Sequence, residues 1–446
     1  MRKVLAVAVF AGCCFLYANA LERQPAADYH ARRENLAAKL DGGTALVFAP
    51  PEAEGPNDLY GYRPDDNFYY LTGWPEPGAA VLIAAARPAT TDNPARPYTE
   101  ILFLPQRNYS QEKWTGPKLG PENPQAAQIT GFDRVESLDK LRDELVKLVL
   151  ARNSVYTDVP APEEVSNSKQ PIYWLQTANA FPVGTSYEDI RPLLGSLRTV
   201  KDAGEIELIR KAVDASVAAQ LAAIRAIRPG MTEREISALL QYEWGKRGCE
   251  RPAYAPIVGS GFDSTILHYS DDSAPIHSGD LVLMDAAGEY SMYASDLTRT
   301  VPADGKFTPR QREIYEIVLG AQKAAIAAFQ SGKSHLQRDQ ADSLYDVALG
   351  YINTHGKDLH GELLGKYFIH GLGHYVGLNV HDPDDYSVPL GPGMVFTLEP
   401  GIYIPEEKIG VRIEDDFYVD KDGKLIRLSE ALPQKPDEIE KLMNVR

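Results

Sequence analysis

The second half of the chain carries one order of elements twice, and this repeat limits the possible folds more than any other feature. In the first copy, apolar residues recur at steps of three and four over 206–227, which predicts an amphipathic helix that ends before Pro229 and Gly230. Thr232 and Glu235 then form a capping box, the pattern that begins a second helix. A histidine-bearing stretch and two predicted strands follow.

The second copy has the same order. Thr308, Pro309 and Gln311 form a helix-opening pattern, in which proline occupies the first helical position. A further helix is predicted from about Gln337 to Thr354, and again a histidine-bearing stretch and two strands come next. We therefore predict two α-α-β-β units related by a pseudo-two-fold axis.

Acidic residues fall at matching places in the two copies. One acid follows a glycine by six residues in each copy, after Gly279 in the first and after Gly393 in the second. A second strand returns a further acid in each, so the four acids are Asp285, Asp296, Glu399 and Glu414. A histidine precedes the first acid of each copy at nearly the same distance, seventeen residues for His268 and eighteen for His381.

Four acids at one place need compensation, because like charges within about 4 to 6 Å raise one another's pKa. Two divalent cations would neutralise all four, and carboxylates can bridge metal ions about 3.5 to 4 Å apart. Oxygen-rich ligation with one or two imidazoles suits manganese, cobalt, iron or zinc. The alternative, four separate surface charges, fits less well, since the neighbouring strand residues are Val, Leu, Ile and Met.

The first half of the chain predicts a separate α/β domain. Its apolar patterns favour two helices and three strands, at 28–40, 138–151, 44–49, 80–85 and 101–104. Long amphipathic helices begin near 197, so we place an N-terminal domain at 21–196 and a catalytic domain at 197–446. The expected fold class is α/β (α+β).

The amino-acid composition and net charge exclude several classes of protein and disfavour one class of partner. Of the 446 residues, 44% are hydrophobic and 24% are charged, as in ordinary soluble globular proteins, which excludes collagen-like, disordered and multi-spanning membrane chains. The length allows two or three domains. The formal net charge of −16 disfavours nucleic acid as a partner.

The first twenty residues have the three parts of a secretory signal peptide. Two basic residues precede an apolar run at 4–17, and the Ala-Asn-Ala triplet at 18–20 fits the small-residue rule for cleavage. We expect a mature chain that begins near Leu21, is exported to the periplasm or secreted, and has no transmembrane segment. A buried N-terminal element and a lipoprotein acylated at Cys13 are the alternatives.

Cleavage after residue 20 would also determine which cysteines remain in the mature chain. It removes Cys13 and Cys14 and leaves Cys249 alone. No intramolecular disulfide could then form, and we expect Cys249 to be a small buried apolar residue.

Five short motifs surround the repeated acids. They are His370-Gly-Leu-Gly-His374, Val380-His381-Asp382, Leu398-Glu399-Pro400-Gly401, Val411-Arg412-Ile413-Glu414-Asp415 and Leu297-Thr298-Arg299-Thr300. In combination they resemble the pita-bread metallopeptidases of the aminopeptidase P and prolidase family. The segment 62–73 is similar to the N-terminal domain of that family, and 112–116 and 257–261 resemble aminopeptidase P more than prolidase.

The resemblance implies a dinuclear metal centre. Its five ligands would be Asp285, Asp296, His374, Glu399 and Glu414. Asp296 and Glu414 would bridge two divalent ions, Asp285 would complete one of them, and His374 with Glu399 would complete the other. The family most suggests Mn²⁺, with Co²⁺ and Zn²⁺ as alternatives, and a hydroxide between the ions as the nucleophile.

The resemblance also implies residues that contact substrate. His268, His370 and His381 would stabilise the oxyanion and assist the leaving nitrogen. Arg412 would lie beside the metal ligands or face the substrate, unless it is a solvated strand residue, and Tyr69 would contribute from the N-terminal domain. The implied catalytic set is His268, His370, His381, Glu399 and Arg412. The glycines between His370 and His374 disfavour a helix there.

The implied function is that of an Xaa-Pro aminopeptidase, which releases the N-terminal residue from peptides with proline in second position. Prolidase, which cleaves only Xaa-Pro dipeptides, is the nearest alternative, because the two differ in loops. A creatinase-like amidinohydrolase or a non-catalytic peptidase-like binding module would lack the ligands that this chain retains. The resemblance further implies a homo-oligomer, a dimer or a tetramer.

Overall fold

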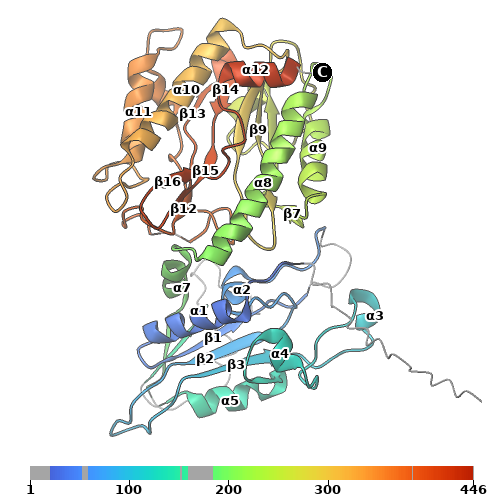
Figure 1. Cartoon of the computed structure of the whole chain (residues 1–446), viewed down its shortest axis with the longest axis vertical. Helices are drawn as coiled ribbons and strands as arrows, with labels where there is room; N and C mark the ends of the chain where they lie inside the picture. Colours follow the sequence, from blue (N-terminus) through green and yellow to red (C-terminus); the bar gives the residue numbers. More distant parts are fainter. Residues whose placement is uncertain (1–20, 53–58, 151–152, 159–183, 384, 445–446) are drawn as a thin grey trace, which may run out of the picture.

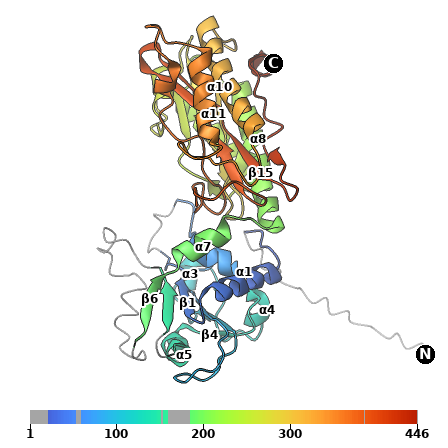
Figure 2. The same cartoon turned by 90° about the vertical axis from the view of Figure 1, so that its left-hand side faces the viewer.

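A computed structural model describes residues 21–52, 59–150, 153–158, 184–383 and 385–444. The predicted signal peptide at 1–20 lies outside these residues. Two bodies stand end to end along the long axis of the molecule, as two perpendicular views agree (Figures 1 and 2). The chain leaves the first body through α7 (Arg191–Arg198) and enters the second through α8 (Ala203–Ala226).

The N-terminal body is built on one mixed sheet of six strands, in the order β4-β3-β2-β1-β5-β6. Its strands are β1 (Thr44–Phe48), β2 (Ala80–Ala84), β3 (Thr99–Leu104), β4 (Val135–Ser137), β5 (Ser154–Thr157) and β6 (Ser186–Asp189). The central strands β1, β2 and β3 pair antiparallel. The outer pairs β3–β4, β1–β5 and β5–β6 are parallel.

Helices cover both faces of this sheet, because its strands send alternate side chains into two cores. Along β2, Val81 and Ile83 belong to one core, whereas Ala80 and Leu82 belong to the other. The first core lies under α1 (Ala26–Lys39), α2 (Asp66–Thr72) and α7, and the second under α5 (Leu141–Leu148). Two short helices, α3 (Glu112–Thr115) and α4 (Ala126–Thr130), complete this body.

The elements predicted for the first half are confirmed, with small changes at their ends. The predicted helix 28–40 is α1, and the three predicted strands are β1, β2 and β3. The helix predicted at 138–151 begins as a 3₁₀ turn at Leu138–Lys140, continues as α5 and ends at Leu148.

The two predicted helix pairs flank the strands of the second body. Helices α8 and α9 (Glu233–Gly245) lie on one side, and α10 (Pro309–Ala328) and α11 (Leu344–His355) lie on the other, with α12 (Pro436–Asn444) near the end remote from the first body (Figure 1). The capping box predicted at Thr232 and the helix start predicted at Thr308 are confirmed, and Thr308 and Asp202 form further capping boxes at the starts of α10 and α8.

The predicted start of the fourth helix, near Gln337, is wrong. Asp339 and Asp342 have φ angles of 60° and 48°, in the left-handed region that a right-handed helix does not contain. Ser343 then caps the helix by accepting a hydrogen bond from the backbone N–H of Asp346, so α11 begins only at Leu344.

Antiparallel strands fill the space between the helix pairs. The first copy supplies β7 (Arg251–Pro252), β8 (Ile257–Ser260), β9 (Leu281–Asp285), β10 (Gly288–Glu289) and β11 (Thr298–Pro302). The second supplies β12 (Val395–Leu398), β13 (Gly401–Ile404), β14 (Ile409–Arg412), β15 (Asp415–Val419) and β16 (Leu425–Arg427). The copies meet where Thr298 forms a β-bridge with Glu414, so predicted ligands of both copies reach one seam.

Two further sequence expectations concern the whole chain. Cys249 is free and buried, as expected for an apolar role. In the part of the chain that the structure describes, no helix has both the length and the apolar character needed to cross a membrane.

Candidate active site

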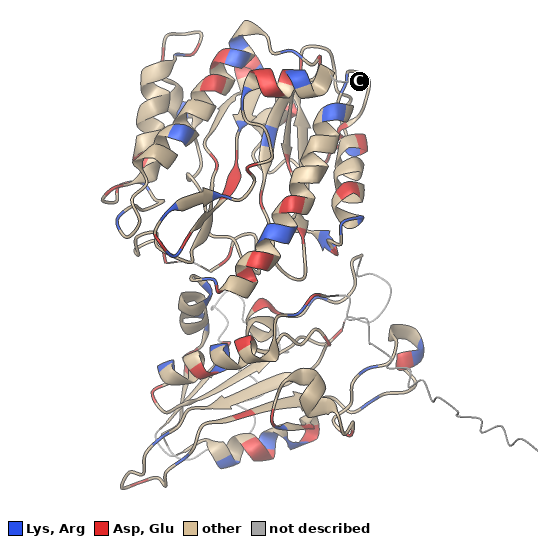
Figure 3. Ribbon diagram, in the orientation of Figure 1, with Lys and Arg blue, Asp and Glu red and all other residues tan. Residues whose placement is uncertain are grey.

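The second body contains a cavity of about 650 Å³ at the seam between the two copies. Nine of the ten predicted site residues line it: His268, Asp285, Asp296, His370, His374, His381, Glu399, Arg412 and Glu414. Figure 3 shows acidic segments inside this body, between the helix pairs, as well as on its outer helices. Residues up to 146 positions apart in sequence, from His268 to Glu414, thus share one surface.

The tenth residue, Tyr69, is a correction. It lies in α2 of the N-terminal body, is fully buried, and packs edge-on against Tyr29 of α1 with ring centroids 6.2 Å apart. It does not line the cavity. The consecutive aromatic residues of α2 are all buried, so none of them is free to contact a substrate in the cavity.

The four acids stand where strands of the two copies end or begin. Asp285 is the last residue of β9 and Glu399 directly follows β12. Asp296 lies two residues before β11, and Glu414 lies between β14 and β15. The chain segments that hold His370 and His374 contain no helix, as the glycine spacing predicts.

One buried glutamine from each copy fixes the backbone beside these acids. The side-chain amide of Gln220, in α8, donates to the carbonyl oxygens of Met284, Ala286 and Leu297 at 3.3, 3.1 and 3.2 Å. Gln322, in α10, donates to the carbonyl oxygens of Leu398 and Ile413 at 2.9 and 3.3 Å. Every carbonyl belongs to a neighbour in sequence of a predicted ligand, so the pseudo-symmetry extends to the supports of the site.

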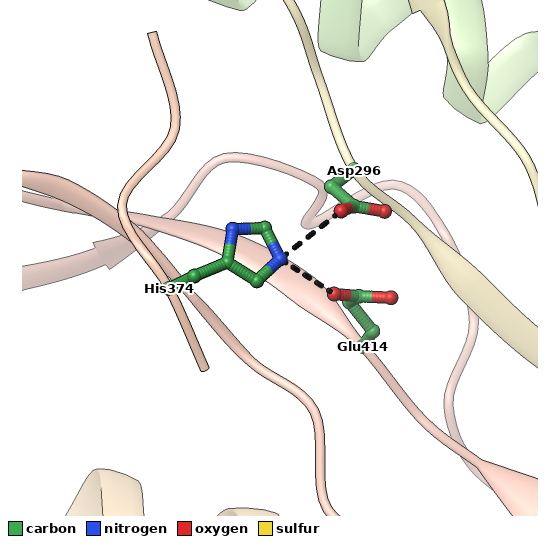
Figure 4. A group of neighbouring side chains, drawn as sticks. All are labelled: Asp296, His374 and Glu414. Carbon is green, nitrogen blue, oxygen red and sulfur yellow. Dashed lines mark ion pairs between the residues drawn. The ribbon is translucent and has the colours of Figure 1, made fainter. Parts of the chain in front are cut away.

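Asp296, His374 and Glu414 form the centre of the acid cluster. Each offers one ligand atom, and these atoms all lie within 4.8 Å of one another. Figure 4 shows the His374 ring directed at both acids, with Nε2 3.3 Å from Asp296 Oδ2 and 4.0 Å from Glu414 Oε1. Glu399 Oε1 lies 3.5 Å from the same nitrogen. Such a spacing would let one cation contact several of these atoms at once.

The residues fit a divalent metal centre. Carboxylate oxygens with one imidazole nitrogen form a donor set suited to such ions. Asp285 offers a further atom, since its Oδ1 is buried without a hydrogen-bond partner while Oδ2 accepts from Arg412. A buried carboxylate oxygen without a partner is costly unless a cation or donor faces it.

The cluster is electrostatically strained. Burial, together with the charges of its acidic neighbours, raises the pKa of Glu399 to about 7 and the pKa of Glu414 well above its ordinary value. Burial alone would lower the pKa of His374, but its hydrogen bond to Asp296 and the charge of Glu399 raise that pKa to about 9. The protein therefore holds protons in this cluster that a bound cation would displace.

Three residues that sequence reasoning missed hold the acids in place. Tyr254 donates its hydroxyl hydrogen to Asp296 Oδ1 at 2.6 Å, and Thr298 donates to Glu414 Oε2 at 2.6 Å. Asp416 accepts from the backbone N–H of Asp296 at 2.9 Å. Only Thr298 lies in a motif quoted from the sequence, and nothing in the spacing points to Tyr254.

Arg412 is a buried cation at the cavity and not a solvated strand residue. It is buried, forms an ion pair with Asp285, and donates to the Tyr403 hydroxyl at 2.7 Å. That hydroxyl lies 2.9 Å from His370 Nε2. Burial and the nearby Arg412 charge lower the pKa of His370 to about 3, so its imidazole is neutral. Because His370 Nδ1 lies 2.8 Å from the Gly371 carbonyl oxygen, the ring proton resides on Nδ1 and Nε2 accepts from Tyr403.

The loop that carries His268 is tied down by Glu233, the first residue of α9. This fully buried carboxylate accepts from the backbone N–H and the hydroxyl of Ser260 at 2.7 and 2.8 Å. It also accepts from the Tyr269 hydroxyl at 2.9 Å and the Ala274 N–H at 2.8 Å. One side chain thus holds both ends of the loop and leaves His268 exposed at the cavity.

The fold and the acid-rich centre define a metal-dependent peptidase, and comparisons with known proteins agree. Residues 207–421 match the model of metallopeptidase family M24, and residues 29–156 match the aminopeptidase P N-terminal domain. The chain belongs to the aminopeptidase P proteins of metallopeptidase family M24, which confirms the resemblance seen in its motifs.

Individual relatives match over nearly their whole length. The Xaa-Pro aminopeptidase of Escherichia coli is 34% identical over 93% of this chain and 97% of the relative, and that of Haemophilus influenzae is 33% identical over 95% and 99%. Among solved structures, aminopeptidase P from E. coli with the inhibitor Pro-Leu superposes with a TM-score of 0.81 at 30% identity, covering 95% of this chain and 99% of that one. Proline aminopeptidase P II from Yersinia pestis gives 0.80 at 31% identity, over 95% and 100%.

Proposed function

We propose that this protein is an Xaa-Pro aminopeptidase, which hydrolyses the bond between the first residue of a peptide and a proline in second position. The observation that carries this proposal is the cluster of Asp296, His374 and Glu414 in a cavity of an aminopeptidase P fold. The relatives that match over nearly the whole chain are named Xaa-Pro aminopeptidase, which favours this activity over prolidase.

Two divalent ions, first of all Mn²⁺, would be held by Asp285, Asp296, His374, Glu399 and Glu414. Five ligand side chains around one cavity support two ions, because single catalytic zinc sites commonly use three protein ligands. Bound ions would supply Lewis acidity and an ionised water at neutral pH.

The remaining residues would recognise a substrate that lacks one hydrogen-bond donor of an ordinary peptide. A peptide bond before proline has no N–H, so it cannot donate the backbone hydrogen bond that many proteases use. A bound divalent ion, as a Lewis acid, would favour the free terminal amine of the substrate instead. His268 and His381, both exposed at the cavity, would donate hydrogen bonds to the substrate carbonyl or protonate the leaving nitrogen.

The purified protein should cleave an Xaa-Pro-Yaa tripeptide faster than an Xaa-Pro dipeptide, and an Xaa-Ala-Yaa control least. Activity should need added Mn²⁺ and disappear with a chelator. The release of the first residue, followed by chromatography, measures all three substrates in one assay. Cleavage of the dipeptide alone would make the protein a prolidase, and no cleavage of any peptide by metal-loaded protein would overturn the proposal.

Without metal, the protein should lose stability as pH rises from about 5 to 9. Burial raises the folded-state pKa of Glu399, so the folded state binds more protons than the unfolded state between about pH 4.5 and 7. The raised pKa of His374 adds stability that is present below its unfolded value and is lost as pH rises through about 9. The two effects have the same sign and amount to on the order of 1–3 kcal/mol each.

Thermal unfolding of chelator-treated protein at several pH values measures this slope. Added Mn²⁺ should raise the melting temperature most at high pH, where the acids are ionised. A metal-free protein that is most stable at pH 9 would contradict the described cluster.

Export and assembly are also part of the proposal, supported by sequence alone. The signal-peptide pattern at 1–20 supports cleavage after Ala20 and a periplasmic or secreted protein. Oligomerisation, as a dimer or a tetramer, rests on family resemblance. N-terminal sequencing of protein from the extracytoplasmic fraction should begin at Leu21, and light scattering should give the size of the assembly.

A further inference from the structure

His381 is carried by a segment, 376–383, that contains neither helix nor strand. Its ring lies at the cavity with its centroid 4.3 Å from that of His374, and its backbone N–H donates to Asn379 Oδ1 at 3.0 Å. Backbone hydrogen bonds hold the start of this segment, from Val376 to Val395 and from Ala294 to Gly377, and side-chain contacts hold the part nearer to His381.

The next residue, Asp382, is buried and uses both of its oxygens. Oδ1 accepts from Arg198 Nη2 at 2.6 Å and from the backbone N–H of Asn379 at 3.2 Å. Oδ2 accepts from Lys201 Nζ at 3.1 Å. The backbone N–H of Asp382 donates to the carbonyl oxygen of Tyr375 at 3.0 Å. Asp382 therefore fixes the turn immediately before and after His381.

Both cations come from outside the catalytic strands. Arg198 ends α7, Lys201 lies between α7 and α8, and both side chains are buried. The pKa of Asp382 is lowered, because the charges of Lys201 and Arg198 outweigh the effect of burial, so the carboxylate is ionised. A buried cluster of this kind has one favourable geometry, since moving any member leaves a charge without its partner.

The N-terminal body holds the same turn at further points. Arg198 Nη1 donates to Asn67 Oδ1, in α2, at 2.7 Å. Asn379 Nδ2 donates to Asp66 Oδ2 at 3.3 Å, and Arg63 Nη2 donates to the carbonyl oxygen of Leu378 at 2.6 Å. Side chains of the N-terminal body thus help to hold the turn 378–382 of the second body in place.

Another contact between the two bodies does not involve Asp382. A second ion pair, between the buried Arg32 of α1 and the partly exposed Asp202 at the start of α8, also joins the bodies, with Nη2 2.6 Å from Oδ2. Neither residue of that pair lines the cavity. The contacts around Asp382 differ from the Arg32–Asp202 pair because Asp382 is the neighbour of His381 in sequence.

We propose that Asp382, held by Arg198 and Lys201, is a positioning residue that sets His381 against the substrate, so that docking of the N-terminal body controls turnover. This inference rests on the proposed function, because it concerns the same cavity. His381 is the group that touches substrate, and Asp382, Arg198 and Lys201 act through it.

The test compares Arg198→Gln with the matched control Arg32→Gln in the full, Mn²⁺-loaded protein. Both changes remove a buried arginine from an inter-body ion pair, so both should lower the melting temperature. Only Arg198→Gln should lower kcat/KM for an Xaa-Pro-Yaa tripeptide, by about 10- to 100-fold, because a misplacement of about 1 Å has effects of this size. The metal content of both variants should equal that of the wild type.

A double-mutant cycle with His381→Ala shows whether the effect passes through His381. Arg198→Gln should add no further loss when His381 is already alanine. An equal loss in both backgrounds, or an equal loss from Arg32→Gln, would overturn the inference. If Arg198→Gln does not fold, Asn67→Ala decides by the same cycle, because it removes the acceptor that holds Arg198 Nη1 and leaves the Arg198–Asp382 ion pair in place. Turnover of the tripeptide by the wild type separates this test from a failure of the proposed function.

Discussion

Replacement of Glu414 by glutamine should abolish peptidase activity while the protein stays folded. Glu414 lies at the seam of the two copies, offers one oxygen to the cluster with Asp296 and His374, and accepts from Thr298 with the other. The change preserves shape but removes a negative charge that a divalent ion requires. A loss of several kcal/mol of charge stabilisation corresponds to at least about 10³-fold in kcat/KM.

Kinetics and metal analysis of the purified variant measure this effect. The matched control is Glu406→Gln, which removes an exposed glutamate that pairs with exposed His360 and does not line the cavity, and which should leave both activity and metal content unchanged. A Glu414→Gln variant with wild-type turnover and a full complement of metal would show that Glu414 is not a ligand.

Replacement of Arg299 by methionine should have the largest effect on stability. Arg299 and Asp415 form a fully buried ion pair with Nη2 and Oδ1 2.6 Å apart. Arg299 also donates to four carbonyl oxygens, those of Thr298, Glu414, Leu432 and Pro433. The variant would leave the buried Asp415 without its nearest cation, with Arg427 at 3.7 Å as its remaining ion-pair partner, and removal of one member of a buried pair costs about 3–5 kcal/mol of unfolding free energy.

Urea unfolding followed by circular dichroism gives the free energies to compare. Arg312→Met is the control, since its partners Asp437 and Glu440 lie at 2.8 and 2.7 Å in a more exposed part of the surface. That change should cost less than about 1 kcal/mol. Equal costs for the two variants would mean that burial of the Arg299 pair has no energetic consequence.

The sequence predicted the features that depend on local chemistry or on the repeat. The capping boxes at Thr232 and Thr308 involve residues three apart, so their patterns are visible in one turn of helix. The first acid of each copy, Asp285 and Glu399, was predictable because it follows a glycine by six residues in both copies, and a second strand then returns a further acid in each. A spacing that recurs in two copies indicates that the two acids occupy equivalent positions in the fold. A single acid gives no such indication.

Contacts between segments distant in sequence were not predictable. Tyr254 bonds Asp296 across 42 positions, and Arg198 bonds Asp382 across 184, without any pattern that links the members of either pair. The interpretation of Tyr69 failed for a related reason, because a run of aromatic residues does not say which of them faces a neighbouring domain. The start of α11 was missed because the aspartates at 339 and 342 adopt left-handed backbone angles that side-chain periodicity does not encode.

The bridge between Thr298 and Glu414 joins the two copies at the acid cluster, so the cluster is complete only when both copies have packed together. Of the predicted ligands, the first copy alone would bring together only Asp285 and Asp296, two carboxylates that repel each other. His374, Glu399 and Glu414 arrive only when the second copy has packed against the first. Tight metal binding during refolding should therefore begin only after the last long-range contact between the two copies has formed. Helix formation should be detected much earlier.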